Sequence, residues 1–155
     1  GLCYSRKSSK KSDINILETI KFKDCAQFIP PIRDGRVIKV YDGDTITIAT
    51  KVPNLINSSV YRFSVRLNGI DCPEIKSKDS DEKEIALLVK KKLSDKVFGK
   101  MVTLENIKLE KYGRLLADVY LGDIHLNKWL LDTSCAVQYD GGTKKEICWK
   151  SYFEG

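Results

Sequence analysis

The sequence is poor in the residues that build transition-metal sites and disulfide frameworks. It has one histidine, His125, and an odd set of five cysteines without a CxxC pair. Structural zinc sites need clustered Cys and His ligands, and disulfide scaffolds need paired cysteines, so neither is expected here. No apolar run approaches the roughly 20 residues of a transmembrane helix, and no secretory leader is recognisable. The sequence therefore predicts reduced thiols in a cytosolic compartment.

An excess of acidic residues is also absent. Lys and Arg number 27 against 21 Asp and Glu, which gives a net charge of +6 and a pI near 9.0. A basic protein favours acidic partners such as nucleic acid or an anionic membrane surface. Residues 1–12 carry four basic side chains and no acid, so this tail accounts for +4 and the rest of the chain is only mildly basic. With 155 residues, one domain with its own core is expected.

The N-terminal tail carries signals for lipid attachment. After removal of an initiator Met, Gly1 and Ser5 match the myristoylation pattern, and Cys3 is placed for palmitoylation. Basic residues between 6 and 11 add attraction to anionic lipid, and two such signals hold a protein more firmly than one acyl chain. We expect attachment to the cytoplasmic face of a membrane through this tail. The alternative is an unacylated basic tail.

The chain is expected to divide into three parts. Residues 1–12 form the tail, residues 13–34 a linker that packs on the domain, and residues 35–155 the folded domain. Within the linker, Pro30-Pro31 force an extended backbone.

The domain alternates short strands with helical segments. Asp42-Gly43 is a hairpin turn signal between two strands, and the spacing after Asp79 predicts a helix that ends near Gly99. Further helices are expected over about 125–133 and from about 143. Strands are expected over 36–41, 44–50, 61–67, 101–109 and 114–121, with a bulge near Glu105-Asn106. This order predicts a five-stranded Greek-key barrel of the OB-fold type with helices packed on it, an α+β fold.

The segment from Arg66 to Glu74 concentrates charge at a chain corner. The strand that reaches Arg66 breaks at Asn68-Gly69, and Pro73 prevents ordinary strand pairing beyond it. Asp71 and Glu74 therefore lie on an ordered corner close to an arginine. Such a corner suits metal-assisted chemistry on an anionic substrate, and it also suits a polar turn with a surface ion pair.

Two other charged sites also fall at strand ends or turns. They are Asp44, after the first hairpin turn, and the segment from Lys111 to Arg114. If they converge with the corner at one end of the barrel, Asp44 and Asp71 become oxygen ligands for Ca²⁺ or Mg²⁺. Arg66 and Arg114 would then form a phosphate clamp.

Three motifs give the chain a wider resemblance. Val-Tyr-Asp-Gly-Asp-Thr occupies 40–45, Arg-Leu-Asn-Gly-Ile-Asp-Cys-Pro-Glu occupies 66–74, and Lys-Tyr-Gly-Arg occupies 111–114. In these motifs, and over about residues 35–142, the sequence resembles the staphylococcal-nuclease (thermonuclease) family. The resemblance implies that Asp44, Asp71 and the backbone carbonyl of Cys72 bind Ca²⁺.

The same resemblance assigns the remaining roles. Glu74 corresponds to the general base, and Arg66 and Arg114 correspond to the arginines that stabilise the phosphoryl transition state. Lys111 and Tyr112 match positions that contact a flanking phosphate. Tyr139 is a weaker candidate for substrate contact, because the tyrosines frequent in this region of the family are replaced here by Tyr139 and Asp140-Gly141-Gly142.

The resemblance implies a Ca²⁺-dependent, monomeric nuclease that hydrolyses DNA and RNA with little sequence preference, single strands being favoured. One alternative is a catalytically silent OB-fold module that binds nucleic acid or protein. Another is a lipid-anchored adaptor. The presence of all five charged positions favours catalysis, because a silent copy would be free to lose them.

Overall fold

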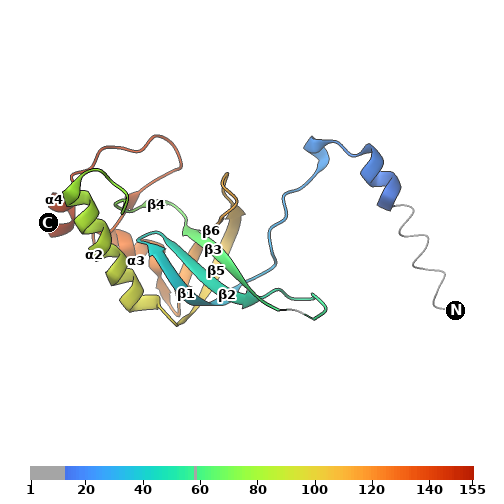
Figure 1. Ribbon diagram of the computed structural model, residues 1–155, viewed down its shortest axis with the longest axis horizontal. Coiled ribbons are helices and arrows are strands. Elements are labelled where there is room, and N and C mark those ends of the chain that lie inside the picture. The colour runs from blue at the N-terminus through green and yellow to red at the C-terminus, as the bar shows by residue number, and fades with distance from the viewer. Residues whose placement is uncertain (1–12, 58) are drawn as a thin grey trace.

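The barrel predicted from the sequence is present. The computed structural model describes residues 13–57 and 59–155. Within them, five strands pair in the order β3-β2-β1-β5-β6, and a parallel pairing of β3 with β6 closes the barrel (Figure 1). The OB-type α+β fold is thus confirmed. The barrel strands are β1 (Asp34–Asp42), β2 (Thr45–Lys51), β3 (Val60–Leu67), β5 (Met101–Leu109) and β6 (Leu115–Leu121).

Alternating apolar residues fill the barrel interior. Buried side chains come from every second position of a strand, as in β6, because successive side chains point to opposite faces. The alternating apolar side chains of 61–67 are buried only at Val65 and Leu67, while Tyr61 is 43% exposed. The reason is that β3 contacts β6 only from Val65 onward, so its first half has a neighbour on one side alone.

The first hairpin turn lies one residue later than expected. β1 runs to Asp42, which pairs with Thr45, so Gly43 and Asp44 form the turn. An irregular register between Val40 and Asp42 accounts for the shift. The bulge expected near Glu105-Asn106 is confirmed by a register shift after Glu105.

Helix α2 (Ser80–Val97) packs against the barrel and follows the 66–74 corner. The Asp79 carboxylate caps it by accepting the N–H groups of Asp81 and Glu82. Leu88 shares the helical spacing of the buried apolar residues, yet it is 45% exposed, and Ala86 is buried. The other buried residues of this helix are Ile85, Val89, Leu93 and Val97.

The remaining elements are short. β4 (Ile70–Asp71) pairs with β8 (Val137–Gln138), and β7 (Ile124–His125) pairs antiparallel with the end of β6. His125 stacks on Tyr120 with ring centres 4.7 Å apart, which fits a structural role. Helix α3 spans Leu126–Asp132, and α4 spans Trp149–Glu154 and packs on α2. The last helix therefore begins later than the predicted position near 143.

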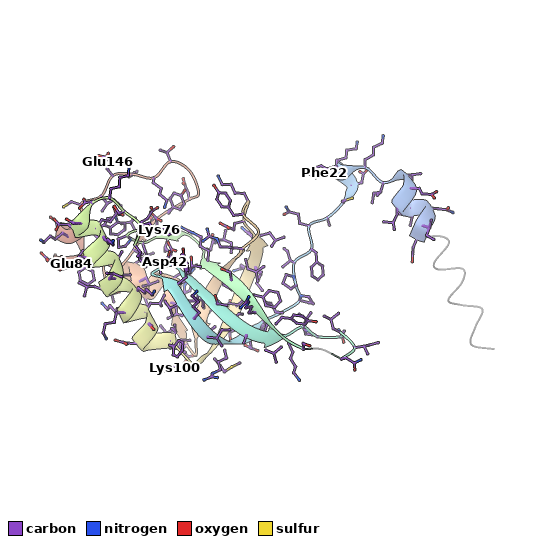
Figure 2. The ribbon with its side chains drawn as sticks, viewed as in Figure 1. Phe22, Asp42, Lys76, Glu84, Lys100 and Glu146 are labelled. Carbon is purple, nitrogen blue, oxygen red and sulfur yellow. The ribbon has the colours of Figure 1, made fainter. Side chains whose placement is uncertain are left out.

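The N-terminal segment leaves the barrel (Figure 1). Residues 13–19 are helical and the 3₁₀ turn η1 spans Phe22–Asp24. The packing expected of 13–34 occurs only at its end, where Pro30 and Ile32 are buried; residues 13–29 are exposed, and Phe22, in Figure 2, is 97% exposed. The apolar side chains before Pro30-Pro31 therefore do not pack on the barrel.

Two sequence expectations concern the chain's relation to membranes. Within the described ranges, no helix is both long and apolar enough to cross a bilayer. The lipidation predicted for Gly1 and Cys3 falls outside the described residues and stays a prediction.

Candidate active site

The charged positions singled out in the sequence meet at one cavity. Its volume is about 420 Å³, and Figure 2 labels two of its lining residues, Asp42 and Lys76. Every residue predicted to be catalytic or to bind metal lines it: Asp44, Arg66, Asp71, Cys72, Glu74 and Arg114. The convergence required by the sequence argument is therefore present.

The first hairpin turn brings Asp44 to the corner. Gly43 is buried so tightly that an added Cβ would lie 2.6 Å from the Val89 side chain and 3.0 Å from that of Cys72. The Asp44 carbonyl accepts the Leu67 N–H at 2.8 Å, and its carboxylate accepts the Cys72 N–H at 3.3 Å. Glycine at 43 thus allows the turn, the helix and the corner to approach one another.

A buried amide supports the corner from the other side. Asn127, at the start of α3, accepts the Val119 N–H and donates to the Asn68 and Ala117 carbonyls at 2.8 and 3.2 Å. Its side chain therefore links α3, β6 and the chain just before Asp71. Sequence reasoning did not identify Asn127, since an isolated Asn in a helical pattern carries no signal of burial.

Arg66 is fixed by the backbone. Its guanidinium donates to the carbonyls of Ile70 at 3.0 Å and Leu67 at 3.3 Å, and its side chain is only 12% exposed. The same Nη2 atom lies 3.5 Å from the Asp44 carboxylate and 3.6 Å from that of Asp71. One guanidinium nitrogen is thus shared by both predicted metal ligands.

Burial acts against the negative charge of both aspartates. Burial, helped by the neighbouring Asp42 carboxylate and opposed by Arg66, raises the pKa of Asp44 to about 6. Burial also raises the pKa of Asp71. Two desolvated carboxylates beside each other favour a cation between them.

The donor chemistry fits a hard divalent ion. Asp44 and Asp71 offer oxygen ligands, which Ca²⁺ and Mg²⁺ prefer, and both ions complete their shells with carbonyls and water. In residues 13–57 and 59–155, no group of three or more His, Cys, Asp or Glu side chains is arranged to hold a metal. A site here would therefore rest on two carboxylates, with the remaining ligands from the Cys72 carbonyl and solvent.

Cys72 contributes packing through its side chain. Burial raises the pKa of its thiol well above the ordinary value, so the sulfur stays protonated. The cysteines in the described part of the chain are all free: Cys25, Cys72, Cys135 and Cys148.

Glu74 lies at the open side of the cavity. Its side chain is 58% exposed, and its backbone N–H donates to the Glu82 carboxylate at 3.0 Å. Glu82 lies three residues after the N-cap residue Asp79, where a glutamate can complete a capping box. It instead accepts bonds from Glu74 and Ser77 and so ties the corner to the start of α2.

Arg114 is oriented by a residue that the sequence reasoning missed. Glu110, across the turn between β5 and β6, accepts from Nε at 2.7 Å and from Nη2 at 3.0 Å. This bidentate pair fixes the plane of the guanidinium. The sequence did carry a signal for this pair. Glu110 precedes Arg114 by four residues, and the two residues flank a tight turn that brings them together.

A second missed residue is Lys144, in the loop between β8 and α4. Its Nζ lies 2.8 Å from the Glu74 carboxylate and 3.0 Å from that of Asp71. The predicted base and one predicted metal ligand thus share a lysine from a distant part of the sequence. No periodicity or motif in the loop indicated this position.

The predicted substrate contacts line a neighbouring cavity of about 550 Å³. Lys111, Tyr112 and Tyr139 lie there, and the cavity shares Arg66, Arg114 and Lys144 with the first. The Tyr112 side chain is 75% exposed. The Tyr139 ring lies 5.6 Å from the Arg66 guanidinium, and its hydroxyl donates to the Gly142 carbonyl at 2.7 Å.

A small OB barrel with two buried carboxylates and two oriented arginines at one cavity defines a class of protein suited to bind a phosphate together with a cation. The particular family follows from comparison with known sequences. The profile of the family described as staphylococcal nuclease homologue matches residues 64–151, more than half of the chain. The chain belongs to this family.

Several curated relatives are similar to the chain. A protein of Haemophilus influenzae named an uncharacterized endonuclease is 38% identical over 104 residues, covering 67% of this chain and 51% of the relative. A protein of Escherichia coli O157:H7 with the same name is 33% identical over 107 residues, covering 68% and 61%. A probable endonuclease of Schizosaccharomyces pombe is 30% identical over 152 residues, covering 84% and 65%. The chain thus spans about half to two thirds of the length of these relatives.

Proposed function

We propose that the protein is a Ca²⁺-dependent nuclease that hydrolyses phosphodiester bonds of DNA and RNA with little sequence preference. The observation that carries the proposal is the meeting of Arg66, Arg114, Glu74 and the two buried aspartates at one cavity. Family membership and the endonuclease names of the relatives support it.

Each charged group has a defined task in this reaction. Asp44, Asp71 and the Cys72 carbonyl would hold Ca²⁺, which supplies positive charge beside the phosphate when bound. The guanidinium groups of Arg66 and Arg114 donate to the phosphate oxygens and stabilise the negative charge that grows as water attacks. A planar guanidinium can bond a protein oxygen with some of its N–H groups and a phosphate with others, which a lysine cannot do in the same fixed geometry.

Glu74 acts as the general base. Its carboxylate takes a proton from the attacking water as the water oxygen bonds to phosphorus, and the bond from phosphorus to the leaving oxygen breaks. The leaving oxygen takes its proton from solvent. The exposure of Glu74 at the cavity rim gives it access to that water.

The neighbouring cavity supports a preference for single strands. Lys111 can neutralise a flanking phosphate, while the exposed Tyr112 ring, and more weakly Tyr139, can stack on a base. Stacking tolerates any base because every base has a π-face. Unpaired bases present that face freely, which favours single-stranded DNA and RNA.

The test is cleavage of labelled single-stranded DNA and RNA by the protein in CaCl₂, before and after chelation. Glu74→Gln should lower the rate by on the order of 10²–10³-fold, the usual size for loss of a proton-transfer or charge-stabilising group. Glu84→Gln makes the same chemical change on the exposed surface of α2 and should leave the rate unchanged (Figure 2). Cleavage that survives chelation, or binding of DNA without cleavage by the unaltered protein, would overturn the proposal.

A further inference from the structure

The loop that carries Lys144 is held at both ends. Before the lysine, Tyr139 donates its backbone N–H to the Gly69 carbonyl at 2.9 Å, next to the corner. After it, the buried Trp149 anchors α4, and the Tyr152 hydroxyl donates to the Ala136 carbonyl at 3.1 Å. The exposed middle of the loop, shown arching past the start of α2 in Figure 1, therefore keeps Lys144 within reach of the site.

Two cationic side chains contact Asp71, and they differ in how they are held. Arg66 is 12% exposed and bonded to two backbone carbonyls, so it is a fixed part of the cavity wall. Lys144 is 46% exposed and forms ion pairs with the carboxylates of Asp71 and Glu74. Its ammonium can return to water at the end of a flexible stem, whereas the guanidinium cannot.

The lysine remains charged in this position. Its Nζ forms ion pairs with the carboxylates of Asp71 and Glu74 at 3.0 and 2.8 Å. A full positive charge thus lies 3.0 Å from a carboxylate that would bind a divalent cation. Arg66 already lies 3.6 Å from the same oxygen, so a divalent cation bound there would add a third positive charge and repel the mobile ammonium.

We propose that Lys144 is an internal counter-cation that competes with a divalent cation for Asp71. Binding of the ion displaces the ammonium from Asp71 and, through the shared lysine, also frees Glu74. Ion binding and release of the base are then a single event, because one side chain contacts both carboxylates. The role of the freed Glu74 rests on the proposed function, whereas competition at Asp71 does not.

The test measures calcium binding directly by titration calorimetry of the whole chain with CaCl₂ after chelator treatment. Lys144→Ala and Lys144→Met should bind Ca²⁺ about three- to tenfold more tightly, the size expected for removing one partly solvated charge contact. Lys145→Ala removes the same charge one residue away and should change affinity less than twofold. Lys144→Arg keeps the charge and should stay closer to the unaltered protein than Lys144→Ala does.

A second reading comes from the calcium concentration that gives half-maximal cleavage, which should fall by the same factor in Lys144→Ala. If calcium binds with the expected order of affinities but no variant cleaves DNA, the competition stands and the proposed nuclease function fails. If the unaltered protein cleaves DNA and Lys144→Ala binds calcium no more tightly, the competition fails and the function stands. An unaltered chain that binds no calcium, or equal tightening by Lys145→Ala, overturns the inference.

Discussion

The two arginines at the cavity are oriented by different means. Arg66 is bonded to the main-chain carbonyls of the corner, so its position follows the backbone. Arg114 depends on one side chain, Glu110, which occupies Nε and Nη2 and leaves Nη1 without a bond to that carboxylate. A change at Glu110 should therefore act on Arg114 while leaving Arg66 in place.

The Glu110–Arg114 pair gives a prediction about stability and pH. The hydrogen bond from Arg114 lowers the pKa of Glu110, so the pair stabilises the fold above the ordinary value near 4.5 and is lost as pH falls through the lowered pKa. Glu110→Gln should cost about 0.5–1 kcal/mol of unfolding free energy at pH 7, discounted for the partial exposure of Arg114.

Urea unfolding of both proteins at pH 7 and near pH 3 measures this effect. The difference between them should shrink at the lower pH, where the carboxylate of the unaltered protein takes up a proton. A difference that is equal at both pH values would show that the charge on Glu110 is not its cause. Glu84→Gln, on an exposed helix surface, is the matched control.

At the scale of elements, the site depends on how closely three segments approach. The β1–β2 turn, the Asp71 corner and α2 meet where Gly43 has no side chain, and this contact places Asp44 beside Cys72. Helix α3 supports the same corner through the buried Asn127 amide. The positions of the carboxylates are therefore set by packing between elements rather than by the site residues alone.

Gly43→Ala tests that packing. Its methyl group would lie 2.6 Å from Val89, so the turn or the helix must shift. Overpacking of this kind typically costs about 1–3 kcal/mol, seen as a lower urea midpoint, and calcium should bind more weakly as Asp44 moves.

Gly142→Ala adds the same methyl where its nearest neighbour is the tip of the Asp140 side chain, at 3.1 Å, and should cost much less. Equal stability and equal calcium affinity in Gly43→Ala and the unaltered protein would contradict the packing argument.

At the scale of the whole molecule, the barrel and most of the cavity followed from local patterns. The alternation of 115–121 predicted β6, and three short motifs predicted the residues that line the cavity. Lys144 could not be predicted in this way, because its position depends on two anchors on either side of an irregular loop. The 13–29 segment was misjudged for a related reason: apolar spacing indicates a helix face but does not identify the surface that it contacts.

The parallel pairing that closes the barrel also sets the sensitivity of the site to partial opening. It joins Val65 to Leu115 and Arg66 to Leu116, and on β3 it involves only the residues Val65–Leu67. Arg66 and Arg114 lie in or next to these paired strand ends. A brief parting of this short seam would separate Arg66 from Arg114 while α2 and the β1–β2 hairpin stay folded. In a urea titration, cleavage activity should therefore be lost at a lower urea concentration than the helical circular-dichroism signal. Coincidence of the two curves would contradict a separate opening of this strand pair. Transient separation of this one strand pair would then be enough to abolish phosphate binding.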